Sequence, residues 1–113
     1  MLPTGARVLI CTEPQDMRRS FDRLAAVVRD ELGDEPQSGA YFVFVSKSMT
    51  RAKVLWWDRN GYCLLSKRLH EALFRLPVGA PRVGKAMQID TGALAKLLAG
   101  VAHEKEKKVT PLH

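Results

Sequence analysis

The sequence predicts a small α+β protein, in which a mixed or antiparallel sheet of about four to five strands packs against two helices. Three observations predict this class. Two short runs are apolar and β-branched, as buried strands are. An Asn60-Gly61 dipeptide lies between two strand-like segments, and two stripes of apolar residues recur at helical spacing. The strands and helices follow one another without a repeat, which predicts one domain over residues 1–102.

The first strand and the first helix are expected within the N-terminal third. Residues 7–12 read Arg-Val-Leu-Ile-Cys-Thr and end at Glu13-Pro14, which is typical of a buried strand. A helix should follow, with Asp16 as its N-cap and Gly33 as its C-terminal cap. The stripe that it would bury consists of Met17, Phe21, Leu24, Ala25, Val28 and Leu32.

A second strand and a hairpin follow a polar loop at residues 34–39. Residues 41–45 read Tyr-Phe-Val-Phe-Val, apolar on both sides, which predicts a central strand covered above and below. Residues 54–59 and 62–67 flank Asn60-Gly61, the dipeptide that most readily takes both positive-φ positions of a type I′ turn. This hairpin is the clearest local signal in the chain.

The hairpin can be divided into two faces, because strand side chains alternate. The face expected to join the core carries Ala52, Val54, Trp56, Asp58, Cys63, Leu65, Lys67 and Leu69. The opposite face carries Lys53, Leu55, Trp57, Arg59, Tyr62, Leu64, Ser66 and Arg68. The second face combines three cations with two aromatic rings. With Arg51 added, the predicted binding residues are Arg51, Lys53, Trp57, Arg59, Tyr62 and Arg68.

The C-terminal part should contain one more helix. Residues 73–77 indicate a short extended piece, and residues 79–85 a flexible loop. Asp90 can cap a helix whose buried stripe would be Leu94, Leu97, Leu98 and Val101. Residues 103–113 have no apolar period and are expected to form a charged, disordered tail.

The net charge of +6 is unevenly distributed. Residues 1–50 hold six Lys and Arg against seven Asp and Glu, whereas residues 51–113 hold twelve against five. A basic half favours a polyanionic partner, because bound cations release counterions from phosphates. The alternative is that the excess only maintains solubility.

Several segments together resemble the TnpB accessory proteins of the IS-sixty-six family of insertion sequences. They are Phe42-Val43-Phe44, Lys53 to Asp58, Gly61, Lys67-Arg68-Leu69, Phe74 and Pro77, with Asp16-Met17-Arg18, Phe21 and Leu24 upstream. The likeness spans about residues 5–100 and does not extend to the larger RNA-guided nuclease also called TnpB. It implies a protein encoded beside a separate transposase and assisting transposition. The chain departs from the family at residues 46–51, where family members look more basic, and at His70, Ala72, Leu73 and Leu76.

No catalytic, cofactor or metal site is predicted. Cys11 and Cys63 lie in apolar runs, which suits buried free thiols, and the histidines lack metal-ligand spacing. Half of the twelve carboxylates lie in or beside the first predicted helix, as caps or a solvated face: Asp16, Asp22, Asp30, Glu31, Asp34 and Glu35. Residues 79–85 have the glycine spacing of a phosphate-binding P-loop, but Ala86 replaces the required hydroxyl.

The prediction is therefore a non-catalytic accessory protein of transposition that binds nucleic acid, namely DNA, through the basic aromatic hairpin face. The alternative is a protein adaptor that uses this face to dock on the transposase or a sister accessory protein. A homodimer through the hairpin edge is compatible with both. Neither a membrane span nor a secretory signal is recognisable, so we expect a cytoplasmic protein.

Overall fold

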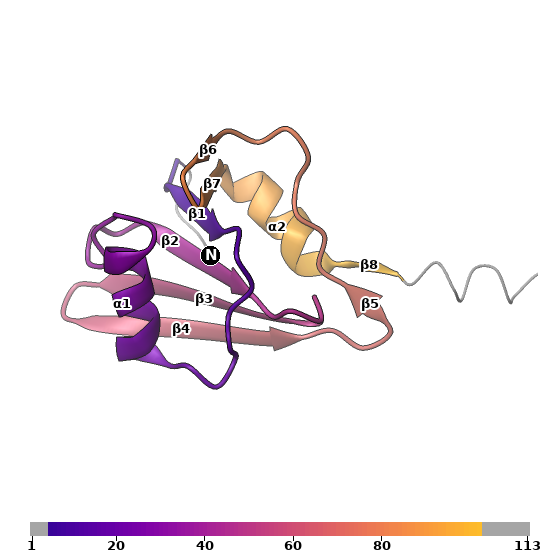
Figure 1. Cartoon of the computed structure of the whole chain (residues 1–113), viewed down its shortest axis with the longest axis horizontal. Helices are drawn as coiled ribbons and strands as arrows, with labels where there is room; N and C mark the ends of the chain where they lie inside the picture. The colour runs from indigo at the N-terminus through magenta and orange to yellow at the C-terminus, as the bar shows by residue number, and fades with distance from the viewer. Residues whose placement is uncertain (1–4, 103–113) are drawn as a thin grey trace, which may run out of the picture.

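The computed structural model of the protein describes residues 5–102, and the tail predicted at residues 103–113 lies outside the described residues. Within this range the elements are, in chain order, β1 (Val8–Cys11), α1 (Phe21–Asp30), β2 (Tyr41–Val45), β3 (Arg51–Asp58), β4 (Gly61–Arg68), β5 (Ala72–Leu73), β6 (Arg82–Val83), β7 (Ala86–Ile89), α2 (Thr91–Ala99) and β8 (Val101–Ala102). Figure 1 shows their arrangement.

Six strands form one sheet in the order β4-β3-β2-β1-β7-β6. β1 and β2 run parallel, while the other neighbouring pairs of this sheet are antiparallel. β5 and β8 pair separately as a two-stranded sheet. The predicted α+β class, with a mixed sheet and two helices, is confirmed, although the structure has more strands than predicted.

Apolar side chains cover both faces of the sheet. On one face, Phe42 of β2 and Leu55 of β3 join a buried cluster with Leu24 of α1, which lies over β3 and β4 (Figure 1). On the other face, Val43 of β2 belongs to a cluster with Leu94 of α2. β2 is buried at every position, as predicted for a central strand.

The first helix begins later than predicted. Asp16 does not cap it; the Asp16 carbonyl accepts from the Arg19 N–H at 3.1 Å and closes a turn before the helix. The helix starts at Phe21, with Ser20 at the N-cap position. Phe21 is 43% exposed, so its predicted place in the core is wrong: it is the first residue of α1, and the buried residues of the helix begin at Leu24. Gly33 has a φ of 64°, consistent with its predicted capping role.

The hairpin turn lies one residue earlier than predicted. Asp58 pairs with Gly61, so Arg59 and Asn60 form the turn, and of these only Arg59 has a positive φ, 57°. The predicted division into faces survives this shift. The pairing changes from Arg59 with Tyr62 to Trp57 with Tyr62, a difference of two residues, which leaves every side chain on the same face.

The flexible loop predicted at residues 79–85 is wrong in its second half. Arg82–Val83 and Ala86–Ile89 form the β6–β7 hairpin, and β7 pairs antiparallel with β1. The pairing of β7 with β1 places Met87 in the same buried cluster as Val8 and Ile10. The β6–β7 hairpin therefore joins the exposed edge strand β6 to β7, a strand that contributes to the core.

The second helix begins as predicted. The Asp90 carboxylate accepts from the Ala93 N–H at 2.7 Å, and Leu94 and Leu97 are buried. Val101 was predicted to continue the buried stripe, but it lies in β8 and is 38% exposed. The helix ends at Ala99 because Gly100, with a φ of 76°, turns the chain away. No helix within residues 5–102 has the length and apolar character that crossing a membrane requires.

Candidate nucleic-acid interface

Parallel pairing of β1 and β2 brings two loops together. The carboxyl ends of parallel strands meet at one edge, and in open sheets this is where ligands commonly bind. Here the segment after Cys11 and the segment after Val45 leave the sheet side by side. The Gln15 N–H donates to the Val45 carbonyl at 2.9 Å and joins the two segments.

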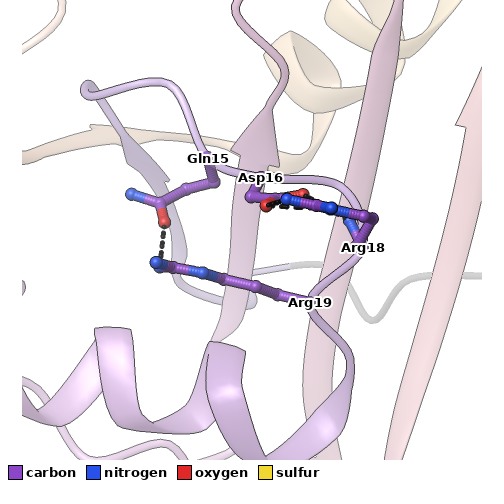
Figure 2. Close-up of polar contacts among 4 residues, drawn as sticks. All are labelled: Gln15, Asp16, Arg18 and Arg19. Atoms are coloured by element: carbon purple, nitrogen blue, oxygen red, sulfur yellow. Dashed lines mark hydrogen bonds and ion pairs between the residues drawn. The ribbon is translucent and has the colours of Figure 1, made fainter.

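Two side-chain pairs fix the segment between β1 and α1 (Figure 2). The Arg18 guanidinium donates to both carboxylate oxygens of Asp16, at 2.7 to 3.1 Å. These bonds hold the pKa of Asp16 well below its usual range, so this carboxylate is ionised whenever the protein is folded near neutral pH. Arg19 Nη1 donates to Oε1 of the buried Gln15 at 2.9 Å.

The loop between β2 and β3 carries a chain of three hydroxyls. Ser46 Oγ lies 3.1 Å from Ser48 Oγ, which lies 2.7 Å from Thr50 Oγ1. The Arg51 N–H donates to Ser46 Oγ at 3.1 Å and anchors the chain to the sheet. Alternate residues of this loop therefore present hydroxyls on one side.

An open hollow of about 490 Å³ lies between these two loops. It is lined by Asp16, Met17, Arg18, Ser46, Lys47, Ser48, Thr50 and Arg51. Three of these side chains are cations and one is an acid, and that acid is already bound by Arg18. We call this feature the polar hollow.

Arg51 and Arg68 extend the positive surface beyond the polar hollow. They are directly opposite each other in the β3–β4 ladder, on the same face, and both are exposed. Neither they nor Lys47 form an ion pair with any residue that the structure describes. We call Arg18, Lys47, Arg51 and Arg68 the basic cluster.

Lys53, a predicted binding residue on this face, has a structural contact. Its Nζ donates to the Arg19 carbonyl at 2.7 Å and is partly buried. The lysine thereby connects β3 to the residue that precedes the Ser20 cap of α1. Its charge adds to the field near the basic cluster, but its side chain also positions the start of the helix.

The other predicted residues lie at the turn end of the hairpin. Trp57 and Tyr62 form an edge-to-face pair with ring centroids 5.0 Å apart, and both are half-buried. Tyr62 also packs against the core that α1 covers. Arg59 is exposed in the turn. Trp57 lies six positions beyond Arg51 along β3, a distance of about 20 Å. The six predicted residues therefore form two groups instead of one patch.

Sequence reasoning missed Arg18 and Lys47 as members of the site. They lie 29 positions apart in the sequence, and only the parallel strand pair brings their loops together. Two signals were present. Asp16-Met17-Arg18 belongs to the motif that carries the family resemblance, and Ser46, Ser48 and Thr50 alternate in a loop where the family looks basic.

Two free thiols lie among the described residues. Burial raises the pKa of the Cys11 thiol, which favours its protonated form. Cys63 is also free but is half-buried, less than predicted, because it lies on edge strand β4. Within residues 5–102, no group of His, Cys, Asp and Glu is placed to hold a metal ion.

The fold and this surface define a small α+β protein whose cations gather where two loops and a hairpin meet. Comparison with known proteins then gives its family. Residues 6–108 match the family described as IS66 Orf2 like protein, and the chain belongs to this family.

Two relatives come from Sinorhizobium fredii, and both are named only as uncharacterized proteins. The chain is 40% identical to y4hO over 103 residues, covering 89% of this chain and 87% of the relative. It is 31% identical to y4jC over 104 residues, covering 92% and 86%. No solved structure matches. The resemblance seen in the sequence is thus confirmed at the level of the insertion-sequence family.

Proposed function

We propose that the protein is a non-catalytic, cytoplasmic accessory factor of insertion-sequence transposition that binds DNA through the basic cluster. One observation carries this proposal: cations from three separate segments converge at the open end of the β3–β4 hairpin, and three of the four lack an acidic partner among the described residues. Unpaired arginines directly opposite each other repel, so an anion placed between them relieves the repulsion.

The shape of the hairpin suggests how DNA would lie. Lys and Arg side chains contact phosphates without reading sequence, which positions a protein on the duplex. The distance of about 20 Å from the basic cluster to Trp57 spans about six base-pair steps along the axis of a DNA duplex. Arg59 and the exposed part of Trp57 would then form a second contact, and in single-stranded DNA an unpaired base could stack there.

A salt titration tests this proposal. Fluorescence anisotropy of a labelled DNA duplex would be measured with the full chain at increasing salt. Four phosphate contacts predict a slope of log affinity against log salt of about −3 to −4. Between about 50 and about 200 mM salt, the affinity should therefore fall roughly a hundredfold. An affinity that is independent of salt would contradict phosphate contact.

A second candidate function, a protein adaptor, is favoured by a different observation. Beside α2, Leu76, Pro77, Val78, Leu97 and Val101 line an apolar groove with Arg75 and Lys96 at its rim, and Val78 is 99% exposed. Such a groove fits an apolar side chain of a partner protein flanked by acidic residues, and the transposase of the element is the partner that the family suggests. The groove and the basic cluster share no residue, so the two functions can be separated.

A further inference from the structure

We propose that the polar hollow is a binding site for a single phosphate group, carried by DNA. The inference deepens the proposed function and rests on it for the source of the phosphate. The hollow itself has features that recognise this group independently of the rest of the DNA: an excess of cations with one oriented arginine, a hydroxyl donor and a pinned loop.

The orientation of Arg18 is the first feature. Its Nε and Nη2 atoms donate to Asp16, and the Arg18 N–H donates to Asp16 Oδ1 at 2.9 Å. The guanidinium therefore meets the carboxylate edge to edge (Figure 2), and its Nη1 has no bond to a residue that the structure describes. Asp16 thus orients a donor rather than filling the hollow with negative charge. A guanidinium with a free edge is well suited to phosphate oxygens.

The hydroxyl chain is the second feature. Ser46, Ser48 and Thr50 hold three O–H hydrogens, but only two bonds join the three oxygens. Ser46 Oγ also accepts from the Arg51 N–H, and this bond uses none of the three hydroxyl hydrogens. One hydroxyl hydrogen therefore remains for an acceptor outside the chain. A phosphate oxygen is an acceptor, and it would take this hydrogen.

The loop that carries these groups is pinned before any ligand binds. The Leu69 N–H donates to the Thr50 carbonyl and the Phe74 N–H donates to the Met49 carbonyl, both at 2.7 Å. The Ser46 N–H donates to the Arg51 carbonyl at 2.9 Å. A loop held in this way loses little freedom on binding, which favours the bound state.

Charge and size select the ligand. Arg18, Lys47 and Arg51 outweigh the one carboxylate, so the hollow attracts an anion. A volume of about 490 Å³ is larger than one phosphate needs and leaves room for an attached sugar. Two sources have this chemistry: an internal phosphodiester of a DNA strand and a terminal phosphate at a DNA end.

Titration with inorganic phosphate tests the site without DNA. Amide chemical shifts of the full chain would be followed by NMR at constant ionic strength. Saturable changes are expected at residues 16–18 and 46–51. Arg18→Gln and Lys47→Gln should each weaken the phosphate affinity about tenfold, because each removes a charge-assisted hydrogen bond. The matched control is Arg29→Gln, an exposed arginine at the last turn of α1, which should leave the affinity unchanged.

Three outcomes decide the proposal. The absence of saturable shifts, or equal phosphate affinity in Arg18→Gln and the unchanged protein, would overturn it. If phosphate binds as expected but no DNA does, the site stands and the proposed function fails. If DNA binds but Arg18→Gln and Lys47→Gln alter neither phosphate nor DNA affinity, the function stands and the site fails.

A comparison of two oligonucleotides identifies the source of the phosphate. They would share one sequence and differ only in a 5′-phosphate or a 5′-hydroxyl. A terminal site predicts tighter binding of the phosphorylated strand, with the difference abolished by Arg18→Gln. An internal site predicts equal binding of both strands, with the affinity for both reduced by Arg18→Gln.

Discussion

Replacing Arg51 and Arg68 together with glutamate is expected to reduce DNA affinity roughly a hundredfold or more at moderate salt. Two phosphate contacts are lost, and the new carboxylates repel the DNA backbone. The fold should survive. Both side chains are exposed, and a Glu–Glu pair at these opposed positions repeats the repulsion of the native Arg–Arg pair. Fluorescence anisotropy gives the affinity, and thermal melting by circular dichroism verifies the fold.

The control for this experiment changes the same number of charges elsewhere. Arg75 and Lys96 are exposed and lie at the rim of the apolar groove beside α2. Arg75→Glu with Lys96→Glu should therefore lower DNA affinity much less than the Arg51 and Arg68 pair. Equal losses in both double variants would show that net charge, rather than the basic cluster, governs binding. Lys53 is unsuitable for this test, because its bond to the Arg19 carbonyl also supports the fold.

The substitution Gly100→Ala is expected to destabilise the protein by about 2–4 kcal/mol. Gly100 has a φ of 76°, which costs energy for any residue with a Cβ. An added Cβ would also lie 2.6 Å from Leu69 Cδ1 and 3.3 Å from the Leu73 carbonyl oxygen. The Leu69 methyl can rotate away from the added Cβ, whereas the Leu73 backbone pairs with Val101 and must shift slightly to relieve the tight contact with its carbonyl oxygen. Urea unfolding would measure the free energy of unfolding.

Gly92→Ala is the matched control for Gly100→Ala. Gly92 lies in α2, and its added Cβ would meet only Asp90 Oδ1 at 3.4 Å, an ordinary contact. Because alanine is a better helix former than glycine, this variant should keep or slightly raise the stability. Gly100→Ala unfolding at the same urea concentration as the unchanged protein would refute the role assigned to the α2–β8 corner.

The elements predicted correctly from the sequence are those whose own residues determine them. β2 was placed at its observed residues, because five consecutive aromatic and β-branched residues after a polar loop favour a strand covered on both faces. The division of the hairpin into faces also held, since it depends on alternation and not on the turn itself. The Asp90 cap likewise needs only a local bond to Ala93.

The elements that were missed depend on distant partners. Ala86–Ile89 contains one β-branched residue and shows no alternation, so it became β7 only through its ladder with β1. Asp16 has the chemistry of a helix cap, but its carboxylate binds Arg18 instead, and the helix begins after the turn. The sequence around Asp16 does not show whether its carboxylate accepts from the first N–H groups of a helix or from Arg18.

The candidate site was predictable in part. Alternation placed Arg51 and Arg68 on one face, as observed. However, alternation does not show what lies above a face, and α1 covers its centre around Leu55. The polar hollow requires the parallel pairing of β1 with β2, which brings residues 16–18 beside residues 46–51. No pattern within either segment indicates that pairing.

NMR mapping of the protein on addition of a DNA duplex tests the central claim most directly. DNA binding through the basic cluster predicts that amide shift changes concentrate at residues 16–19, 46–51 and 66–68, with smaller changes near Trp57 and Arg59. High salt should remove these changes. Shift changes confined to residues 75–78 and 93–97, around the apolar groove, or no changes at any DNA concentration, would contradict it.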